Sequence, residues 1–415
     1  MNNKIIFHID VNSAYLSWTA VSLLQLGTTT LDIRKVPSVI GGSSDERHGI
    51  ILAKSIPAKK YKIQTGEPVG AALNKCPNLK VYPPNYKLFM RCSNAMYDLL
   101  CEYSPFIQRY SVDEVFMDAS HFKFNYMEKA IEIKDKIFKE LGFAVNIGIS
   151  TNKLLAKMAS DFEPKDSIHT LFSEEVSKKM WPLPVGDLFM VGKATKSKLF
   201  NLNINTIGDL ARYDLNTLKP IFKSYANVIH NYANGIDDSE VRSKNYLEIK
   251  GLGNSITLKK DITSRTEALH VLLSLIETTS MRLRENESLC SVIAISLKTT
   301  NFIRYSHQKT LDNNTDCTQE IFTTATQIFD EAWRNEPLRQ LGVRLTHLSS
   351  NEFYQKSFFD DRNIEKNRAL DKTIDNIRKR FGDTSIIRSN FINSDIKPLN
   401  GGVGEDDYLM MGSIL

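Results

Sequence analysis

The spacing of apolar residues divides the chain into two stretches that differ in the order of their strands and helices. In the first stretch, apolar runs that predict buried strands alternate with 3.6-residue patterns that predict amphipathic helices. The strands are expected at residues 4–11, 35–40, 49–54 and 144–150, and the helices at residues 12–26, 57–62, 86–103, 127–141 and 152–162. Strands and helices mixed in this way predict a two-layer α/β domain.

In the second stretch, the predicted elements follow the order β-α-β-β-α-β, which is the order of a ferredoxin-like domain. Its strands are expected at residues 256–262, 292–299, 303–310 and 343–348, and its helices at residues 266–284 and 319–333. A polar, unpatterned segment at residues 237–244 is interpreted as a linker. Several basic residues form one basic surface if they share a face: Lys259, Lys260, Arg265, Lys298, Arg304, Lys309 and Arg344.

Two short helical patterns lie between these stretches, within residues 183–213. One begins at Gly192, and a glycine at a helix N-terminus leaves backbone N–H groups open to a phosphate. Gly192 and Lys193 are therefore candidates for contact with a nucleic-acid backbone. The alternative is that this turn only joins two helices.

The composition is that of a soluble globular protein and leaves the partner open. The 415 residues suggest two to four domains, and a net charge of +5 permits a polyanionic partner without demanding one. The five cysteines are scattered and contain no C-x-x-C pair, which is typical of reduced thiols. No apolar run is long enough for a membrane span or reads as a signal peptide. We therefore expect a cytoplasmic protein without a membrane partner.

Three carboxylates end or interrupt apolar runs. Asp10 lies at the end of the run 5–11, and Asp113 and Glu114 lie between the apolar residues 106–107 and 115–117. Because successive side chains on a strand point to opposite faces, Asp113 and Glu114 can share a site only where the backbone turns. If the two strands are neighbours, three carboxylates converge and need cations, since like charges raise one another's pKa. The alternative for Asp113 and Glu114 is a solvated turn.

Two hard cations held by oxygen ligands would stabilise such a cluster, and Mg²⁺ is the usual one. Two metal ions about 3.5–4 Å apart form the clamp for in-line phosphoryl transfer. The helix expected at residues 152–162 places Lys153 and Lys157 on its polar face, opposite an apolar face. His8 is interpreted as a structural residue of the first strand.

Three motifs in this order resemble those of the Y-family (UmuC/DinB-like) translesion DNA polymerases. They are His8–Tyr15, Ser111–Glu114 and Gly148–Asp161, and the resemblance extends from Met1 to about Leu348. It implies an α+β multidomain fold with a ferredoxin-like palm, small fingers, a helical thumb with a helix-hairpin-helix-like turn, and a β-α-β-β-α-β little finger. The implied domains are a palm at 1–26 and 80–170, fingers at 27–79, a thumb at 171–236, a linker at 237–245, a little finger at 246–350 and a tail at 351–415.

The resemblance also implies a two-metal catalytic site. Asp10 and Asp113 would each bridge two Mg²⁺ ions, Glu114 would hold the catalytic ion, and the Val11 carbonyl would ligate the ion of the nucleotide. Mn²⁺ could substitute for Mg²⁺. The reaction would be attack of the primer 3′-hydroxyl on the α-phosphate of a dNTP.

Further roles follow from the position of single residues in the family pattern. Tyr15 matches the steric gate that excludes a ribose 2′-hydroxyl, and Lys59 and Lys165 match residues that bind the triphosphate. Gly192, Lys193, Lys259 and Arg304 would contact the DNA backbone. The alternatives are that Tyr15 is a core aromatic residue and that Lys59 lies on a solvated face.

The sequence departs from the family pattern at three places. Ile56 stands where an aromatic residue is common, and Lys59 replaces an arginine that would bind phosphate through two hydrogen bonds. Lys165 follows Pro164 instead of preceding a Pro-Asn-Gly run. Met190 replaces the first glycine of a Gly-apolar-Gly turn.

The tail contains a short peptide that resembles the motif by which bacterial proteins bind the sliding clamp. Gln355 is the first residue of this peptide, Ser357 is the third, and Phe358 and Phe359 are the last two. An extended peptide with two aromatic anchors can fill a preformed groove. The alternative is that the two phenylalanines pack back onto the polymerase.

The sequence therefore predicts a monomeric, template-directed DNA polymerase of low fidelity that copies damaged DNA. Its partners would be primer-template DNA, a dNTP and the sliding clamp. Two other functions remain open: a two-metal enzyme like a nucleotidyl cyclase, and a DNA-bound accessory factor whose polymerase site has decayed. A cyclic product formed from ATP or GTP would indicate the first of these.

Overall fold

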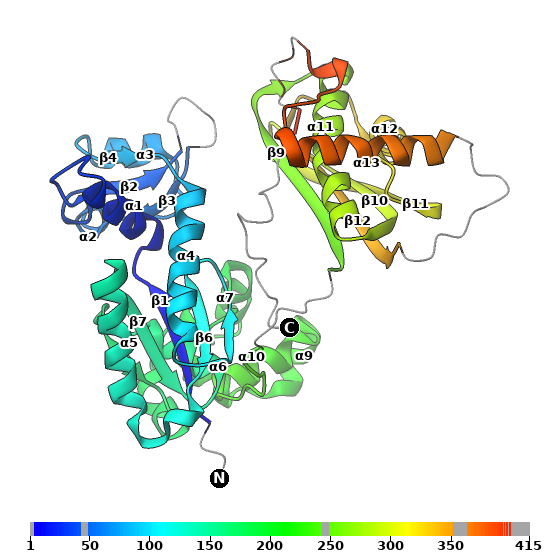
Figure 1. Ribbon diagram of the computed structural model, residues 1–415. Coiled ribbons are helices and arrows are strands. Elements are labelled where there is room, and N and C mark those ends of the chain that lie inside the picture. The colour runs from blue at the N-terminus through cyan, green and yellow to red at the C-terminus, as the bar shows by residue number, and fades with distance from the viewer. Residues whose placement is uncertain are drawn as a thin grey trace. The chain divides into compact units, whose positions relative to one another are not determined.

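The computed structural model describes residues 4–42, 49–242, 249–351 and 363–392, together with residues 394, 396, 398 and 399. These residues form two units, one within residues 4–242 and the other from residue 249 onward (Figure 1). Each unit has hydrophobic clusters of its own. The finer division into palm, fingers and thumb stays a prediction.

The first unit is built on a five-stranded sheet whose central strand carries Asp10. The strand order is β5 (Ile107–Arg109), β6 (Glu114–Asp118), β1 (Ile6–Val11), β7 (Val145–Ser150) and β8 (Ile168–Thr170). Strand β1 pairs antiparallel with β6 and β7, whereas β7 and β8 are parallel. Side chains on β1 alternate, so Phe7 and Ile9 face one side and His8 and Asp10 the other.

Helices cover both faces of this sheet (Figure 1). The side of Phe7 and Ile9 packs against α1 (Ala14–Gln25), α4 (Tyr86–Cys101) and α5 (Tyr126–Leu141). The other side packs against α6 (Lys153–Ser160). Gly148 permits this close packing, because a Cβ atom there would lie 1.9 Å from the carbonyl oxygen of Ala156.

A helical cluster covers the outer side of α6, so this helix is buried on both sides. The cluster contains α7 (Lys193–Phe200), α8 (Ile207–Arg212), α9 (Leu215–Phe222) and α10 (Tyr225–Ala233). It also contains short helical turns at Ser173–Glu175, Val176–Met180 and Val185–Asp187. Because of this burial on both sides, Lys153 and Lys157, which the sequence placed opposite the apolar face, are buried as well.

A small three-stranded sheet completes the first unit. Its strands are β3 (Ile51–Lys54), β2 (Ser38–Gly41) and β4 (Lys80–Tyr82), with a short helical turn at Ile33–Lys35. The basic helix expected at residues 57–62 is shorter, at α2 (Ile56–Lys59). The same part of the chain contains α3 (Val69–Lys75), a helix outside the elements expected from the sequence, which packs Val69 and Ala72 into a separate small core.

The second unit confirms the predicted β-α-β-β-α-β order. The sheet order is β11 (Arg304–Thr315), β10 (Ser288–Thr299), β12 (Leu338–Ser350) and β9 (Gly251–Ile262). The helices are α11 (Arg265–Glu285) and α12 (Thr318–Ala332). Strands β9 and β12 begin five residues earlier than expected, because each start pairs with the other strand: residues 251–255 of β9 pair with 342–346 of β12, and residues 338–341 of β12 pair with the later part of β9.

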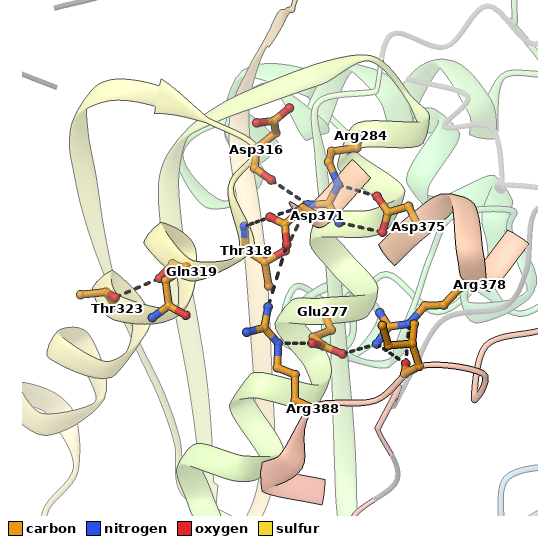
Figure 2. Close-up of polar contacts among 11 residues, drawn as sticks. Glu277, Arg284, Asp316, Thr318, Gln319, Thr323, Asp371, Asp375, Arg378 and Arg388 are labelled. Atoms are coloured by element: carbon orange, nitrogen blue, oxygen red, sulfur yellow. Dashed lines mark hydrogen bonds and ion pairs between the residues drawn. The ribbon is translucent and has the colours of Figure 1, made fainter. Parts of the chain in front are cut away.

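The charged tail helix α13 (Asn363–Phe381) is fixed to α11 and α12 by ion pairs (Figure 2). Arg284 of α11 binds Asp375 at 2.6 Å, and the backbone N–H of Thr318 donates to Asp371 at 2.8 Å. The carboxylate of Glu277 on α11 accepts a hydrogen bond of 2.9 Å from the guanidinium of Arg378 and also forms an ion pair with Arg388. Glu277 and Arg378 are only 3% and 4% exposed, so this network is part of the interior of the second unit.

Replacement of Glu277 by Ala should therefore destabilise the second unit. The change removes the buried carboxylate that Arg378 and Arg388 share, and breaking a buried pair costs about 3–5 kcal/mol of the free energy of unfolding. Hydrogen exchange of the α11 and β10 amides in the full chain measures this loss. Asp330→Ala is the matched control, because it removes the exposed partner of Arg265 and should leave exchange nearly unchanged. Equal exchange in both variants would contradict the prediction.

Candidate active site

The structure brings the backbone of the three predicted carboxylates together at one end of the central sheet. Asp10 on β1 lies directly opposite Glu114 on β6. Asp113 precedes β6, and its carbonyl oxygen accepts a hydrogen bond from the N–H of Val11 at 3.1 Å. The prediction that the two acidic segments are neighbours is thus confirmed.

Both carboxylates of the acidic turn have polar partners. Glu114 Oε1 lies 2.5 Å from the ammonium of Lys157, and Asp113 accepts a hydrogen bond of 2.5 Å from the hydroxyl of Ser111. The same hydroxyl lies 3.4 Å from Glu114 Oε2, so Ser111 bridges the two carboxylates. Among the residues that the structure describes, no three His, Cys, Asp or Glu side chains form a metal-binding group. The convergence of the three side chains on metal ions stays a prediction.

Burial makes negative charge unfavourable at this cluster. Burial, with a smaller contribution from the charges of Glu114 and Asp113, raises the pKa of Asp10 to about 8, although Lys157 acts in the opposite direction. Burial also raises the pKa of Glu114, and the ammonium of Lys157 only partly offsets this effect. A second positive charge near these carboxylates would therefore stabilise their ionised forms.

Lys157 is a residue of this site that the sequence analysis did not identify. Burial alone would lower the pKa of its ammonium, but the charges of Glu114, Asp161 and Asp10 outweigh burial and raise it. Its ammonium also lies 3.5 Å from Asp161, one turn further along the helix. The four-residue spacing of Lys157 and Asp161 was the available signal for an ion pair.

His8 lies beneath the same carboxylates and is fully buried. Its Nδ1 atom is 2.7 Å from the hydroxyl of Ser160, and its Nε2 atom is 3.9 Å from Glu114 Oε1. Burial, together with the charge of Lys157, lowers the pKa of His8 well below its usual range. The imidazole is therefore neutral and adds no positive charge to the cluster.

The donor set fits a hard divalent cation. Asp10, Asp113, Glu114 and the Val11 carbonyl supply only oxygen atoms, which are the ligands that Mg²⁺ prefers. Two observations support the fit: the pKa of buried Asp10 is raised, and a lysine ammonium already lies against Glu114. These residues could hold a metal ion once Glu114 turns away from Lys157.

Tyr15 is half-buried at the start of α1 and follows Asp10 by five residues in the sequence. Its ring stacks on Phe89 of α4, with the ring centroids 4.5 Å apart, and meets the edge of Trp18 at 6.0 Å. The ring therefore has a defined orientation, which a residue that excludes a substituent by size requires.

The two triphosphate candidates come from different elements. Lys59 is exposed at the end of α2. Lys165 is half-buried, and its ammonium donates to the carbonyl oxygen of Asp161 at 2.8 Å, at the C-terminal end of α6. Exposed Ile56 occupies the first turn of α2.

The turn at residues 190–192, which the sequence suggested as a contact for the DNA backbone, has a backbone geometry that favours glycine. Gly192 caps α7 and Lys193 is its first residue, and both are exposed. Met190 has a φ of 72°, in the left-handed region. The family pattern has glycine at this position. The methionine here adopts a backbone conformation that is less favourable for a residue with a Cβ atom than for glycine.

The second unit has an open groove of about 1140 Å³ over β9, β10, β11 and β12. Lys250, Arg304 and Arg344 line it, and its described lining contains no acidic residue. Lys259 is exposed on β9. The basic residues do not all share this face, since Lys309 binds Gln327 of α12 and Arg265 binds Asp330.

Two remaining expectations concern the tail and the membrane. The clamp candidates Gln355, Ser357, Phe358 and Phe359 lie outside the described residues. Within the described ranges, none of the helices combines the length and the apolar composition needed to cross a bilayer.

Comparison with known proteins identifies the family. Residues 9–161 match the model of the impB/mucB/samB family, and residues 249–358 match the model of its C-terminal domain. The chain is 50% identical to DNA polymerase IV of Clostridium acetobutylicum over 95% of its own length and 100% of that protein. It is 34% identical to DNA polymerase IV 1 of Bacillus subtilis over 93% of its own length and 92% of that protein.

Solved structures agree with this assignment at the level of the fold. A Y-family DNA polymerase chimera superposes with a TM-score of 0.71 at 20% identity, over 84% of this chain and 100% of that one. An insertion ternary complex of Dbh DNA polymerase has a TM-score of 0.56 at 19% identity, over the same shares of the two chains. The chain therefore belongs to the impB/mucB/samB family, the Y-family of translesion DNA polymerases.

Proposed function

We propose that Asp10, Asp113 and Glu114 form the two-metal site with which this DNA polymerase extends a primer opposite damaged template bases. The observation that carries this proposal is the pairing of Asp10 with Glu114 across β1 and β6, with Asp113 beside them. The relatives called DNA polymerase IV support the reaction, because they match nearly the whole chain. This match does not favour a cyclase-like enzyme, and the presence of all three carboxylates argues against a decayed site.

The metal would be Mg²⁺, with Mn²⁺ as a substitute. Asp10 and Asp113 would hold both ions, Glu114 the catalytic one, and the Val11 carbonyl the ion of the nucleotide. When bound, the ions would lower the pKa of the primer 3′-hydroxyl and stabilise the leaving pyrophosphate. The fixed β1–β6 pairing would keep these oxygen ligands in place before the substrates bind.

Lys59 and Lys165 would bind the triphosphate, where a cation offsets the charge that develops on the phosphates. The part of the chain around Lys59 is small: the three-stranded sheet with α2, α3 and the turn Ile33–Lys35. Few contacts would therefore test the shape of the new base pair, and little binding energy would reject a wrong one. Low fidelity and tolerance of damaged bases would follow.

The DNA backbone would be bound by Gly192 and Lys193 in the first unit and by Lys259 and Arg304 in the second. The exposed N-terminus of α7 suits a phosphate. The basic groove that contains Arg304 supports a second contact with phosphates. Binding of this kind weakens steeply as the salt concentration rises.

The remaining partners are proposed from the sequence. The peptide with Gln355, Ser357, Phe358 and Phe359 would dock in the groove of a bacterial sliding clamp. The polymerase would act as a monomer in the cytoplasm, where its cysteines, all free in the described structure, would stay reduced.

The first test is primer extension by Asp113→Ala on undamaged and lesion-containing templates. Loss of one metal ligand should lower the extension rate by about 10²–10³-fold or more, whereas DNA affinity should change little. Asp118→Asn is the matched control, because Asp118 lies at the opposite end of β6. Normal extension by Asp113→Ala would show that the metal assignment is wrong.

The second test concerns sugar selection. Removing the ring in Tyr15→Ala should raise the ratio of ribonucleotide to deoxyribonucleotide incorporation by about 10- to 100-fold, measured by single-nucleotide insertion kinetics. Tyr86→Ala removes another ring that contacts Phe89 and should leave the ratio near its normal value. An unchanged ratio in Tyr15→Ala would remove the gate role.

The third test concerns the clamp. Replacing Gln355, Phe358 and Phe359 together with Ala should abolish stimulation of synthesis by the clamp, because the aromatic anchors are lost. Short, distributive synthesis without the clamp should persist. Phe381→Ala, which removes an exposed aromatic ring from α13, is the control. Equal stimulation of the triple variant would show that this peptide is not the docking site.

A further inference from the structure

The ammonium of Lys157 holds two carboxylates at the active site. It lies 2.5 Å from Glu114 Oε1 on β6 and 3.5 Å from Asp161 Oδ2 at the end of its own helix. The side chains of Lys157 and Glu114 are 11% and 16% exposed, whereas that of Asp161 is 52% exposed. The lysine thus has a buried partner and a more hydrated alternative within reach.

Lys157 supplies positive charge to a cluster that is strongly acidic. Asp10 lies opposite Glu114 across β1 and β6, Asp113 directly precedes Glu114, and Asp161 lies 3.5 Å from the ammonium. One ammonium therefore faces four carboxylates, which leaves the cluster short of positive charge.

The contact with Glu114 conflicts with the role proposed for that residue. The ammonium occupies Oε1 of the Glu114 carboxylate, and a metal ion bound to the same carboxylate would lie close enough to the ammonium for strong repulsion. Asp161 offers the displaced ammonium another carboxylate at a spacing of four residues, which places both side chains on the same face of α6. The exchange requires only side-chain rotation.

We propose that Lys157 is an internal counter-cation of the active-site carboxylates. Its ammonium occupies Glu114 while no divalent cation is bound, and it passes to Asp161 when Glu114 takes a divalent cation. This inference rests on the proposed function, because it requires Glu114 to be a metal ligand. Lys157 is thus a positioning residue that keeps an acidic site folded and sets how tightly the site binds its cation.

Mn²⁺ binding to the full-length protein, measured by electron paramagnetic resonance without DNA or nucleotide, tests the proposal. Lys157→Met removes the competing cation and should tighten Mn²⁺ binding by at least about tenfold, which lies between the effect of one charge at contact distance in bulk water and its effect near a protein surface. A measurement at pH 8.5 keeps protons from competing for the carboxylates. Unchanged affinity in a folded Lys157→Met protein would overturn the proposal.

Another lysine of the same helix provides a matched control. Lys153→Met removes a buried ammonium of α6 that binds Gln108 rather than a carboxylate of the cluster. This change should alter Mn²⁺ affinity by less than about threefold, because the ammonium of Lys153 does not contact the cluster and its charge acts on it only at a distance. An effect of Lys153→Met equal to that of Lys157→Met would overturn direct competition.

Glu114→Gln separates the failure of this inference from the failure of the proposed function. If Glu114→Gln binds Mn²⁺ as well as the wild type does, Glu114 is not a ligand, and both proposals fail. If Glu114→Gln binds Mn²⁺ more weakly but Lys157→Met binds it no more tightly, only the counter-cation role fails. Lys157→Gln keeps a hydrogen-bond donor without the charge, and it replaces Lys157→Met if the latter does not fold.

Thermal unfolding gives a second readout that does not depend on activity. Without divalent cations, Lys157→Met should unfold at a lower temperature than the wild type, because Glu114 loses its partner. Mn²⁺ should raise the unfolding temperature of the variant more than that of the wild type, since a tighter ligand stabilises the folded state more. Equal shifts for the two proteins would contradict the exchange.

Discussion

The repulsion among buried carboxylates is the constraint on which the active site depends. Asp10 and Glu114 face each other across two paired strands, in a place where burial raises the pKa of both. Such a cluster is stable only with positive charge beside it. Lys157 supplies one such charge, and the chemistry of phosphoryl transfer would supply the rest. The same feature that makes the site costly to fold thus makes it a binding site for cations.

The two faces of the central sheet have different roles: one packs the hydrophobic core, and the other carries the active-site residues. One face of β1 packs Phe7 and Ile9 against α1, α4 and α5, and this face fixes the strand registers. The other face presents Asp10 to α6, which lies close because Gly148 has no side chain. The position of Lys157 over the carboxylates is therefore set by a backbone-to-backbone approach. Rigid support of this kind is what a precise metal site requires.

A comparison of the two buried ionic clusters clarifies the role of each. In the second unit, four carboxylates pair with four guanidinium groups: Glu277, Asp316, Asp371 and Asp375 with Arg284, Arg368, Arg378 and Arg388. This network is balanced, and it fixes α13 to the helices of the little finger (Figure 2). The cluster around Asp10 has a single lysine against several acids. Balanced charge is typical of a structural contact, and unbalanced charge is typical of a site that binds a ligand of opposite sign.

The sequence by itself determined the acidic segments and the β-α-β-β-α-β order, because each depends on the local alternation of apolar residues or on a motif. Only the structure showed that the two acidic strands are neighbours. The sequence did not determine the direction of the Glu114 side chain, the burial of Lys157 or the docking of α13. These depend on partners that are distant in sequence, such as Lys157 for Glu114 and Arg378 for Glu277. Periodicity identified a polar face on α6, but only the tertiary structure decided that this face meets carboxylates instead of water.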